Sequence, residues 1–158
     1  MTSAEPSPVT SPSGPSGPAD TALCAALANE HAVVYGYGFV SAHCAPEMNT
    51  LVSAALAQHR GRRDQVVSML AGRKVAAPVA AAGYQLPIPV NTPTDALRLS
   101  VRMENDTAAT WRAFLEQAQS SEDRTFGVAA LTQSAVLAAR WKQQLGDWPI
   151  TTAFPGAT

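Results

Sequence analysis

The first helical stretch of the sequence, near residues 20–43, carries one carboxylate in the middle of an apolar stripe. Glu30 falls on a line of residues that recurs every three or four positions and is otherwise apolar, namely Leu23, Leu27, Val34 and Tyr37. Asp20 is expected to be the N-cap of this helix. A buried carboxylate without partners is unfavourable, so other elements must bring groups that hydrogen-bond or neutralise it. Glu30 therefore predicts a fold in which several elements converge on the middle of this helix.

Three more helical stretches follow, near residues 46–72, 93–120 and 121–146. Each has an apolar stripe, and each carries polar groups on or beside that stripe near its midpoint. These polar groups are His59 and Arg63 on the second stretch, Glu104 on the third, and Gln133 and Ser134 on the fourth. In a four-helix bundle, inward-facing groups at equal heights meet, so we expect these side chains to surround Glu30.

The connection between the second and third stretches, residues 73–92, is long and rich in proline. An extended chain of this length spans about 60 Å, whereas the flanking helices are about 35 Å long. The connection is therefore long enough to cross from one end of a bundle to the other, which makes the second and third helices parallel. The expected fold is an all-α four-helix bundle in up-down-down-up order with one long crossover.

The two ends of the chain differ from this pattern. Residues 1–18 are mostly Ser, Pro, Gly and Thr, with little to bury, so we expect a disordered tail there. Residues 19–158 are expected to form a single bundle domain. The last segment, after residue 146, has no helical pattern, and its aromatic side chains Trp148 and Phe154 are expected to dock on the bundle.

Charge and composition exclude several classes of function. A net charge of −1 gives no electrostatic basis for binding nucleic acid or an anionic membrane. The sequence has neither an apolar run of about 18 residues nor the pattern of a secretory signal. Cys24 and Cys44 lie roughly 30 Å apart along one predicted helix, too far for a disulfide within the chain. We therefore expect a cytoplasmic protein.

The first helix has features outside its stripe. Apolar residues on its outer face, including Tyr35 and Phe39, predict a two-fold homodimer formed through the first and second helices. Gly36 and Gly38 weaken the helix by roughly 1 kcal/mol each relative to alanine. They either permit close approach of a helix or ligand, or are small residues tolerated in a long helix.

Four motifs resemble a bacterial ferritin-like family of unknown function. Residues 30–38 read EHAVVYGYG, 59–64 read HRGRRD, 84–90 read YQLPIPV and 102–111 read RMENDTAATW. The resemblance extends from about residue 20 to the end of the chain. It implies a ferritin-like four-helix bundle, and it implies no particular activity.

The ferritin-like resemblance also implies candidate metal ligands. Metal-loaded members of the superfamily use one Glu from each of two helices and Glu-x-x-His from each of the other two. Glu30 and Glu104 take the single-Glu places, and His59 takes the place of one histidine. Leu56 stands where the Glu before His59 would be, and the fourth helix has neither ligand. The resemblance thus implies a metal site with fewer ligands than usual, formed by Glu30, His59 and Glu104, for Fe, Mn or Zn.

Three interpretations of this centre remain open, and whether the protein is an enzyme remains open with them. In the first, Glu30, Glu104, His59 and Arg63 balance in charge without a metal and form a buried ionic cluster in a structural or interaction protein. In the second, the protein binds a metal in a mononuclear or reduced di-metal site, as in an iron-dependent oxidase. In the third, aromatic residues line a small-ligand pocket, namely Tyr35, Tyr37, Trp111 and Trp141.

Overall fold

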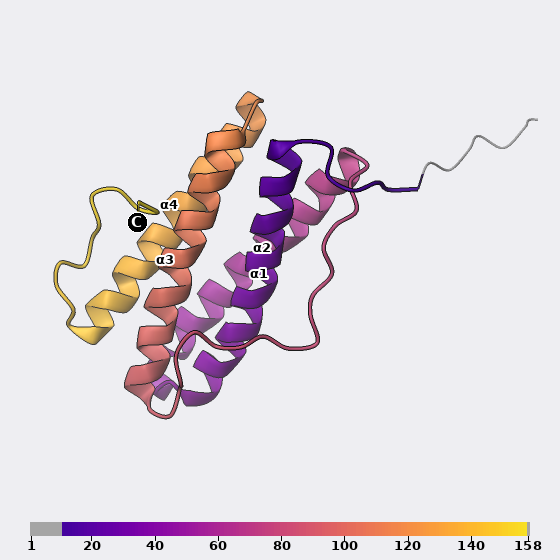
Figure 1. Ribbon diagram of the computed structural model, residues 1–158. Helices are drawn as coiled ribbons and strands as arrows, with labels where there is room; N and C mark the ends of the chain where they lie inside the picture. The colour runs from indigo at the N-terminus through magenta and orange to yellow at the C-terminus, as the bar shows by residue number, and fades with distance from the viewer. Residues whose placement is uncertain (1–10, 158) are drawn as a thin grey trace, which may run out of the picture.

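The computed structural model describes residues 11–157 and shows four long helices joined by loops (Figure 1). Over this range the chain forms no β-strand beyond one isolated bridge, as the all-α prediction requires. No helix in the described range is both long and apolar enough to cross a membrane. The elements are α1 (Pro18–His43), the 3₁₀ turn η1 (Pro46–Met48), α2 (Asn49–Gly72), α3 (Pro93–Gln117) and α4 (Ser121–Leu145).

Arg73, directly after α2, ties three helix ends together. Its guanidinium donates to Asp20 in the first turn of α1, at 3.1 Å, and to Asp123 in the first turn of α4. The start of α1, the end of α2 and the start of α4 therefore lie at one end of the bundle. The short turn before α4 brings the end of α3 there as well. Helices α2 and α3 thus run in the same direction, opposite to α1 and α4 (Figure 1).

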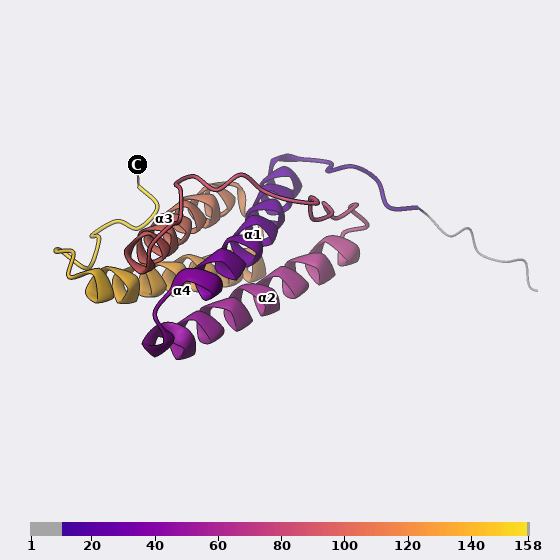
Figure 2. The ribbon, with the colours of Figure 1, turned by 90° about the horizontal axis from the view of Figure 1, so that it is seen from below.

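The crossover, residues 73–92, runs along the bundle over α1 and α3, on the side away from α2 and α4 (Figures 1 and 2). The ring of Tyr84 lies 5.4 Å from that of Tyr35, centre to centre. Further along, apolar residues of the crossover pack against the core, namely Leu86, Ile88 and Val90. The chain's own crossover therefore occupies part of the outer face of α1 for which the sequence predicts a dimer contact.

The ends of α3 and α4 follow from their sequences. Thr92 and Asp95 form a reciprocal capping box at the start of α3. The hydroxyl of Ser120 accepts a hydrogen bond from the backbone N–H of Asp123 and caps α4. Gly146 ends α4 with φ +68°, a left-handed conformation that glycine adopts without strain. The predicted start of the second helix, Pro46, instead begins the 3₁₀ turn η1. Helix α2 therefore begins three residues later, at Asn49.

The start of α1 differs from the prediction. Gly17 is the N-cap and Pro18 takes the first helical position, where a missing N–H has no consequence. Asp20 is not the cap. It lies in the first turn, and its carboxylate accepts a hydrogen bond from the hydroxyl of Ser16 at 2.8 Å. Asp20 is suited to both places, since a carboxylate is favourable at the cap and in the first turn.

Part of the predicted tail is paired with another segment. Ser13 forms a parallel bridge with Val75, its N–H donates to Lys74 and its carbonyl accepts from Ala76. Ser13 of the predicted tail is therefore positioned by backbone hydrogen bonds, which do not depend on apolar side chains. Residues 1–10 of that prediction lie outside the described residues.

The core is divided into two apolar clusters. One surrounds Tyr37 and Trp141 at the end of the bundle where α1 ends. The other surrounds Trp111 and Phe114 at the end where α1 begins. A layer of buried polar side chains lies near the middle of the helices, between the residues of the two clusters. It is here called the ionic layer and consists of Glu30, His59, Arg62, Glu104 and Ser134.

Candidate functional site

The carboxylate of Glu30 is fully buried and bonded on both oxygens. Oε2 accepts from Nδ1 of His59 at 2.7 Å, and Oε1 accepts from Nη1 of Arg62 at 3.0 Å and from Nε1 of Trp111 at 2.8 Å. Burial raises the pKa of Glu30, but the hydrogen bond from His59 and the positive charge of Arg62 outweigh it. The net pKa is below the ordinary value, so Glu30 is a carboxylate at neutral pH.

His59 bridges the two carboxylates of the layer. Besides its contact with Glu30, its Nε2 lies 2.9 Å from Oε1 of Glu104. Burial alone lowers the pKa of His59, but the hydrogen bonds and negative charges of Glu104 and Glu30 raise it to about 9. At neutral pH the ring is therefore an imidazolium that donates one N–H to each carboxylate.

Among residues 11–157, Glu104 has hydrogen-bond partners on one oxygen only. Its Oε1 also accepts from the hydroxyl of Tyr37, and that hydroxyl accepts from Nε1 of Trp141 at 2.9 Å. Burial and the charge of Glu104 raise the pKa of Tyr37 well above its ordinary value, so the hydroxyl stays a donor. The second oxygen of Glu104, Oε2, is buried without a hydrogen-bond partner among the described residues.

The buried guanidinium belongs to Arg62, and the prediction that Arg63 points inward is wrong. The side chain of Arg62 is 3% exposed, whereas that of Arg63 is 30% exposed and pairs with Asp64. Positions three and four residues after His59 lie on the same helix face, so spacing alone does not distinguish Arg62 from Arg63. The choice depends on where α4 lies, because α4 supplies acceptors to Arg62 only.

Arg62 links α2 to α4 as well as to α1. Its Nη1 donates to Oγ of Ser134 at 3.1 Å, and its Nη2 donates to Oε1 of Gln133 at 3.0 Å. Ser134 is fully buried, and Gln133 lies at the exposed edge of the layer. The polar residues predicted for the fourth helix are thus brought to the centre, where they serve as hydrogen-bond acceptors for a cation.

The charges of the ionic layer balance without any further group. Glu30 and Glu104 carry two negative charges, and His59 and Arg62 carry two positive charges. Both nitrogens of His59 hold a proton directed at a carboxylate, so neither offers a lone pair to a metal. Within residues 11–157, no three His, Cys, Asp or Glu side chains are arranged to hold a metal ion. As they lie, these residues form an ion-pair cluster in which both ring nitrogens of His59 face a carboxylate.

Comparison with known proteins places the sequence in a family. The family described as "Domain of unknown function (DUF4439)" matches residues 22–158. The chain belongs to this family. Its fold is similar to the crystal structure of a conserved hypothetical protein, rv2844, from Mycobacterium tuberculosis, with a TM-score of 0.80 and 57% sequence identity. That match covers 80% of this DUF4439 chain and 96% of the other chain. No curated protein matches the sequence significantly.

The four aromatic residues predicted to line a small-ligand pocket have other surroundings in this DUF4439 domain. Tyr37, Trp111 and Trp141 are fully buried between helices, and each donates a hydrogen bond within or beside the ionic layer. Tyr35 is half-buried beneath the crossover. These side chains are therefore parts of the core that also satisfy buried carboxylates.

Two aromatic residues that donate hydrogen bonds to the ionic layer, Tyr37 and Trp111, are not identified from sequence as partners of the carboxylates. Tyr37 follows Glu30 by seven residues, and Trp111 follows Glu104 by seven residues. Seven residues are about two helical turns, so each aromatic lies on the same helix face as the carboxylate before it. A Glu with a Tyr or Trp two turns later, repeated on two helices, is the signal that points to them.

Proposed function

We propose that this DUF4439 protein is a non-catalytic, ferritin-like bundle with a structural or interaction role. The ionic layer stands where a ferritin-like protein would bind metal. The single observation that supports this proposal best is the position of His59 between Glu30 and Glu104, with both ring protons donated. The parallel α2 and α3 with a long crossover support the ferritin-like assignment.

In this proposal the ionic layer selects one packing of the four helices. Glu30 on α1 contacts α2 and α3, His59 on α2 contacts α1 and α3, and Arg62 reaches α4. A shift of any helix by one turn would separate a buried charge from its partner. Breaking a buried ion pair costs about 3–5 kcal/mol, so alternative registers are strongly disfavoured. The ionic layer thus favours one packing arrangement of the four helices over the alternatives.

Burial also argues against a reaction at this centre. The side chains of Glu30, His59 and Glu104 are fully buried. A substrate reaches them only if the helices separate, which would leave the charges unpaired. The proposed role therefore lies in a surface that the rigid bundle presents to a partner.

The alternative is a metal-binding protein, and one observation favours it. Oε2 of Glu104 is buried without a hydrogen-bond partner among the described residues, which is where an additional cation or donor would bind. Metal binding through Glu30, His59 and Glu104 would require His59 to lose a proton and turn from one carboxylate. This alternative makes binding strongly dependent on pH.

Thermal unfolding with and without metal tests the proposal. We expect Mn²⁺, Fe²⁺ or Zn²⁺, and separately a chelator, to leave the Tm of the protein purified without a tag unchanged. A metal present at a hundred times its Kd would stabilise the fold by about 2.7 kcal/mol, which is readily measured. A metal-dependent rise in Tm that is absent in Glu104→Gln would contradict the structural role and establish the alternative.

We also propose a cytoplasmic homodimer that forms through the parts of α1 and α2 left open by the crossover. Val67 on α2 is 39% exposed and offers an apolar contact. Cys24 and Cys44 are both free thiols, which suits a reducing compartment. Sedimentation of the wild type and of Val67→Glu at micromolar concentration tests the dimer. A monomer in both samples would refute it.

A further inference from the structure

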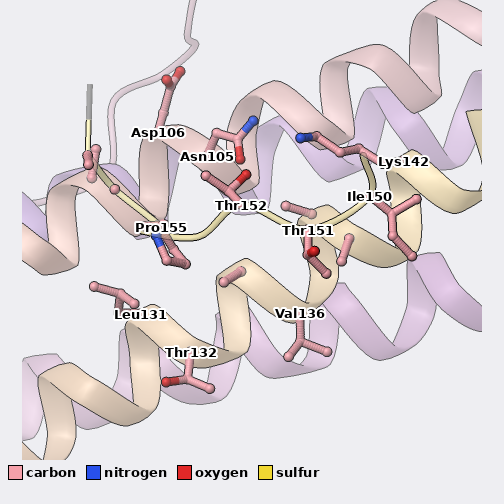
Figure 3. Close-up of a pocket in the computed structure, with 17 residues that line it drawn as sticks. Asn105, Asp106, Leu131, Thr132, Val136, Lys142, Ile150, Thr151, Thr152 and Pro155 are labelled. Carbon is pink, nitrogen blue, oxygen red and sulfur yellow. The ribbon is translucent and has the colours of Figure 1, made fainter. Parts of the chain in front are cut away.

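A cavity of about 570 Å³ lies between α3, α4 and the segment that follows α4 (Figure 3). This volume falls within the roughly 300–1,000 Å³ that is typical of small-molecule sites. The cavity shares no residue with the ionic layer, so its role is independent of the function proposed above. Its apolar walls include Ala108, Leu131, Ala135, Val136, Ala139 and Ile150.

The outer wall of the cavity is a strap formed by residues 150–157. Gly156 holds the strap against α3. Its φ is +78°, and a Cβ built on it would lie only 2.6 Å from the carbonyl oxygen of Ala108. Nη1 of Arg112 also donates to the carbonyl of Gly156 at 3.4 Å. The strap is therefore fastened at its far end, and it crosses the groove between α3 and α4.

The side chains of the strap do not fill the space beneath it. Phe154 of the strap and Trp148, which precedes the strap, are predicted from sequence to dock on the bundle but are 77% and 76% exposed. The cavity is lined from the strap by smaller side chains, including Ile150 and Pro155. The helices contribute several alanines to the opposite walls. The groove therefore stays open although an apolar strap covers it.

One side of the cavity is polar and positively charged. Figure 3 shows Lys142 directed toward Asn105 and Thr152, so an ammonium, an amide and a hydroxyl gather there. No carboxylate of the described residues lies within 4 Å of the Lys142 ammonium as an ion-pair partner. Asp106 also lines the cavity, but both its oxygens accept from Nε of Arg102, which neutralises its charge. Within residues 11–157, the cation at the cavity edge therefore has no ion-pair partner.

We propose that this cavity binds a small amphipathic carboxylate, such as a fatty acid of medium chain length. The carboxylate pairs with Lys142 and accepts hydrogen bonds from Asn105 and Thr152. The aliphatic chain lies along the alanines of α3 and α4 beneath Ile150 and Pro155. Both parts of such a ligand are matched, because burial of the chain is favourable and the anion neutralises an unpaired cation.

Calorimetric titration of the full chain with octanoate, 1-octanol and octylammonium separates the charge from the chain. We expect octanoate to bind at least about tenfold more tightly than octanol, since a charge-assisted hydrogen bond contributes that much. Lys142→Met should reduce octanoate affinity by about the same factor and leave octanol unaffected. The matched control is Arg140→Met, which removes a cation from the exposed side of α4 and should change neither affinity.

A second variant tests the location and does not depend on Lys142. Ala139→Phe should fill the groove and abolish binding of octanoate and octanol together, while circular dichroism shows that the bundle stays folded. The proposal is overturned if octanoate does not bind at millimolar concentration, or if octanol or octylammonium binds as tightly. Unchanged octanoate binding in folded Lys142→Met or Ala139→Phe would also overturn it.

Discussion

The indole Nε1 of Trp111 on α3 donates to Oε1 of Glu30 on α1 at 2.8 Å, and the reverse pair is also present. Tyr37 on α1 donates to Glu104 on α3. Each helix therefore carries a carboxylate and, two turns later, an aromatic donor for the other helix's carboxylate. Because α1 and α3 are antiparallel, an approximate two-fold rotation that exchanges the two helices also exchanges these two contacts. His59 lies between the two carboxylates and completes the arrangement.

Trp111→Phe is expected to lower the free energy of unfolding by about 1–3 kcal/mol, as the loss of one donor to a buried carboxylate does. The aromatic packing is largely kept, and Arg62 still donates to the same oxygen of Glu30. Urea unfolding measures the change. The control is Trp148→Phe, on a side chain that is 76% exposed, which should stay within about 0.5 kcal/mol of the wild type. Equal effects of the two variants would contradict the proposed hydrogen bond.

Replacement of adjacent arginines distinguishes the buried from the surface cation. Arg62→Met leaves Glu30 and the layer with an uncompensated negative charge, and we expect a loss of about 3–5 kcal/mol. Arg63→Met removes a partly exposed pair with Asp64, which contributes at most about 1 kcal/mol. Midpoints of urea unfolding give both values. If Arg63→Met proved the more damaging of the two, the assignment of the inward guanidinium would be wrong.

The stability of the protein should fall as the pH rises from about 6.5 to about 9. The pKa of His59 is raised to about 9 in the fold from an ordinary value of 6.5, so the folded state binds the proton more tightly. The contribution of His59 is therefore complete below pH 6.5 and is lost as pH passes 9. The linkage amounts to on the order of 3 kcal/mol. Tm measured across this range should decline in the wild type, and the decline should be absent in His59→Gln.

Glu30 gives the opposite dependence at low pH. Its pKa is below the ordinary value of 4.5 in the fold, so its contribution is present above that value and is lost as the pH falls through the folded pKa. The ionic layer is therefore at its most stabilising between about pH 4.5 and 6.5. Above this range the test concerns His59. Stability that rose continuously from pH 6.5 to 9 would contradict the assignment of His59 as an imidazolium that bridges the two carboxylates.

Two glycines of α1 should respond oppositely to alanine. A Cβ at Gly36 would lie 2.3 Å from Sδ of Met103, so Gly36→Ala forces α1 and α3 apart or displaces the methionine. We expect a loss of about 1–3 kcal/mol from overpacking, which exceeds the gain of about 1 kcal/mol in helix propensity. Gly38 has open space, so Gly38→Ala should stabilise the protein by up to about 1 kcal/mol. Thermal unfolding of both variants measures these effects, and stabilisation by both would contradict the close helix contact.

The arrangement of the helices could be predicted from sequence because it follows from periodicity and chain length. The stripes around Glu30, His59 and Glu104 place these residues at similar heights, and residues 73–92 are too long for a local turn. The same reasoning left Gly36 undecided. A contact with Met103 depends on how two helices rotate against each other, and the stripe of one helix does not contain that information.

The parts that sequence did not predict depend on a neighbouring element. Arg62 and Arg63 share a helix face, and only the acceptors on α4, Ser134 and Gln133, determine which side chain is buried. The strap has no periodicity from which to place its side chains. Aromatic content suggested that Trp148 and Phe154 dock, whereas the anchoring contact is made by the backbone of Gly156, the smallest residue of the segment.

The contacts of Arg73 have a consequence for how the bundle opens. One guanidinium holds the first turns of α1 and α4 at the end of α2, so fraying of any one of these termini removes a partner from the other two. Isolated helix ends normally exchange their amide hydrogens independently and fastest of all. In this protein the amides at these three ends should exchange as one cooperative unit with a common opening free energy. In Arg73→Met the three ends should open independently, each with its own opening free energy.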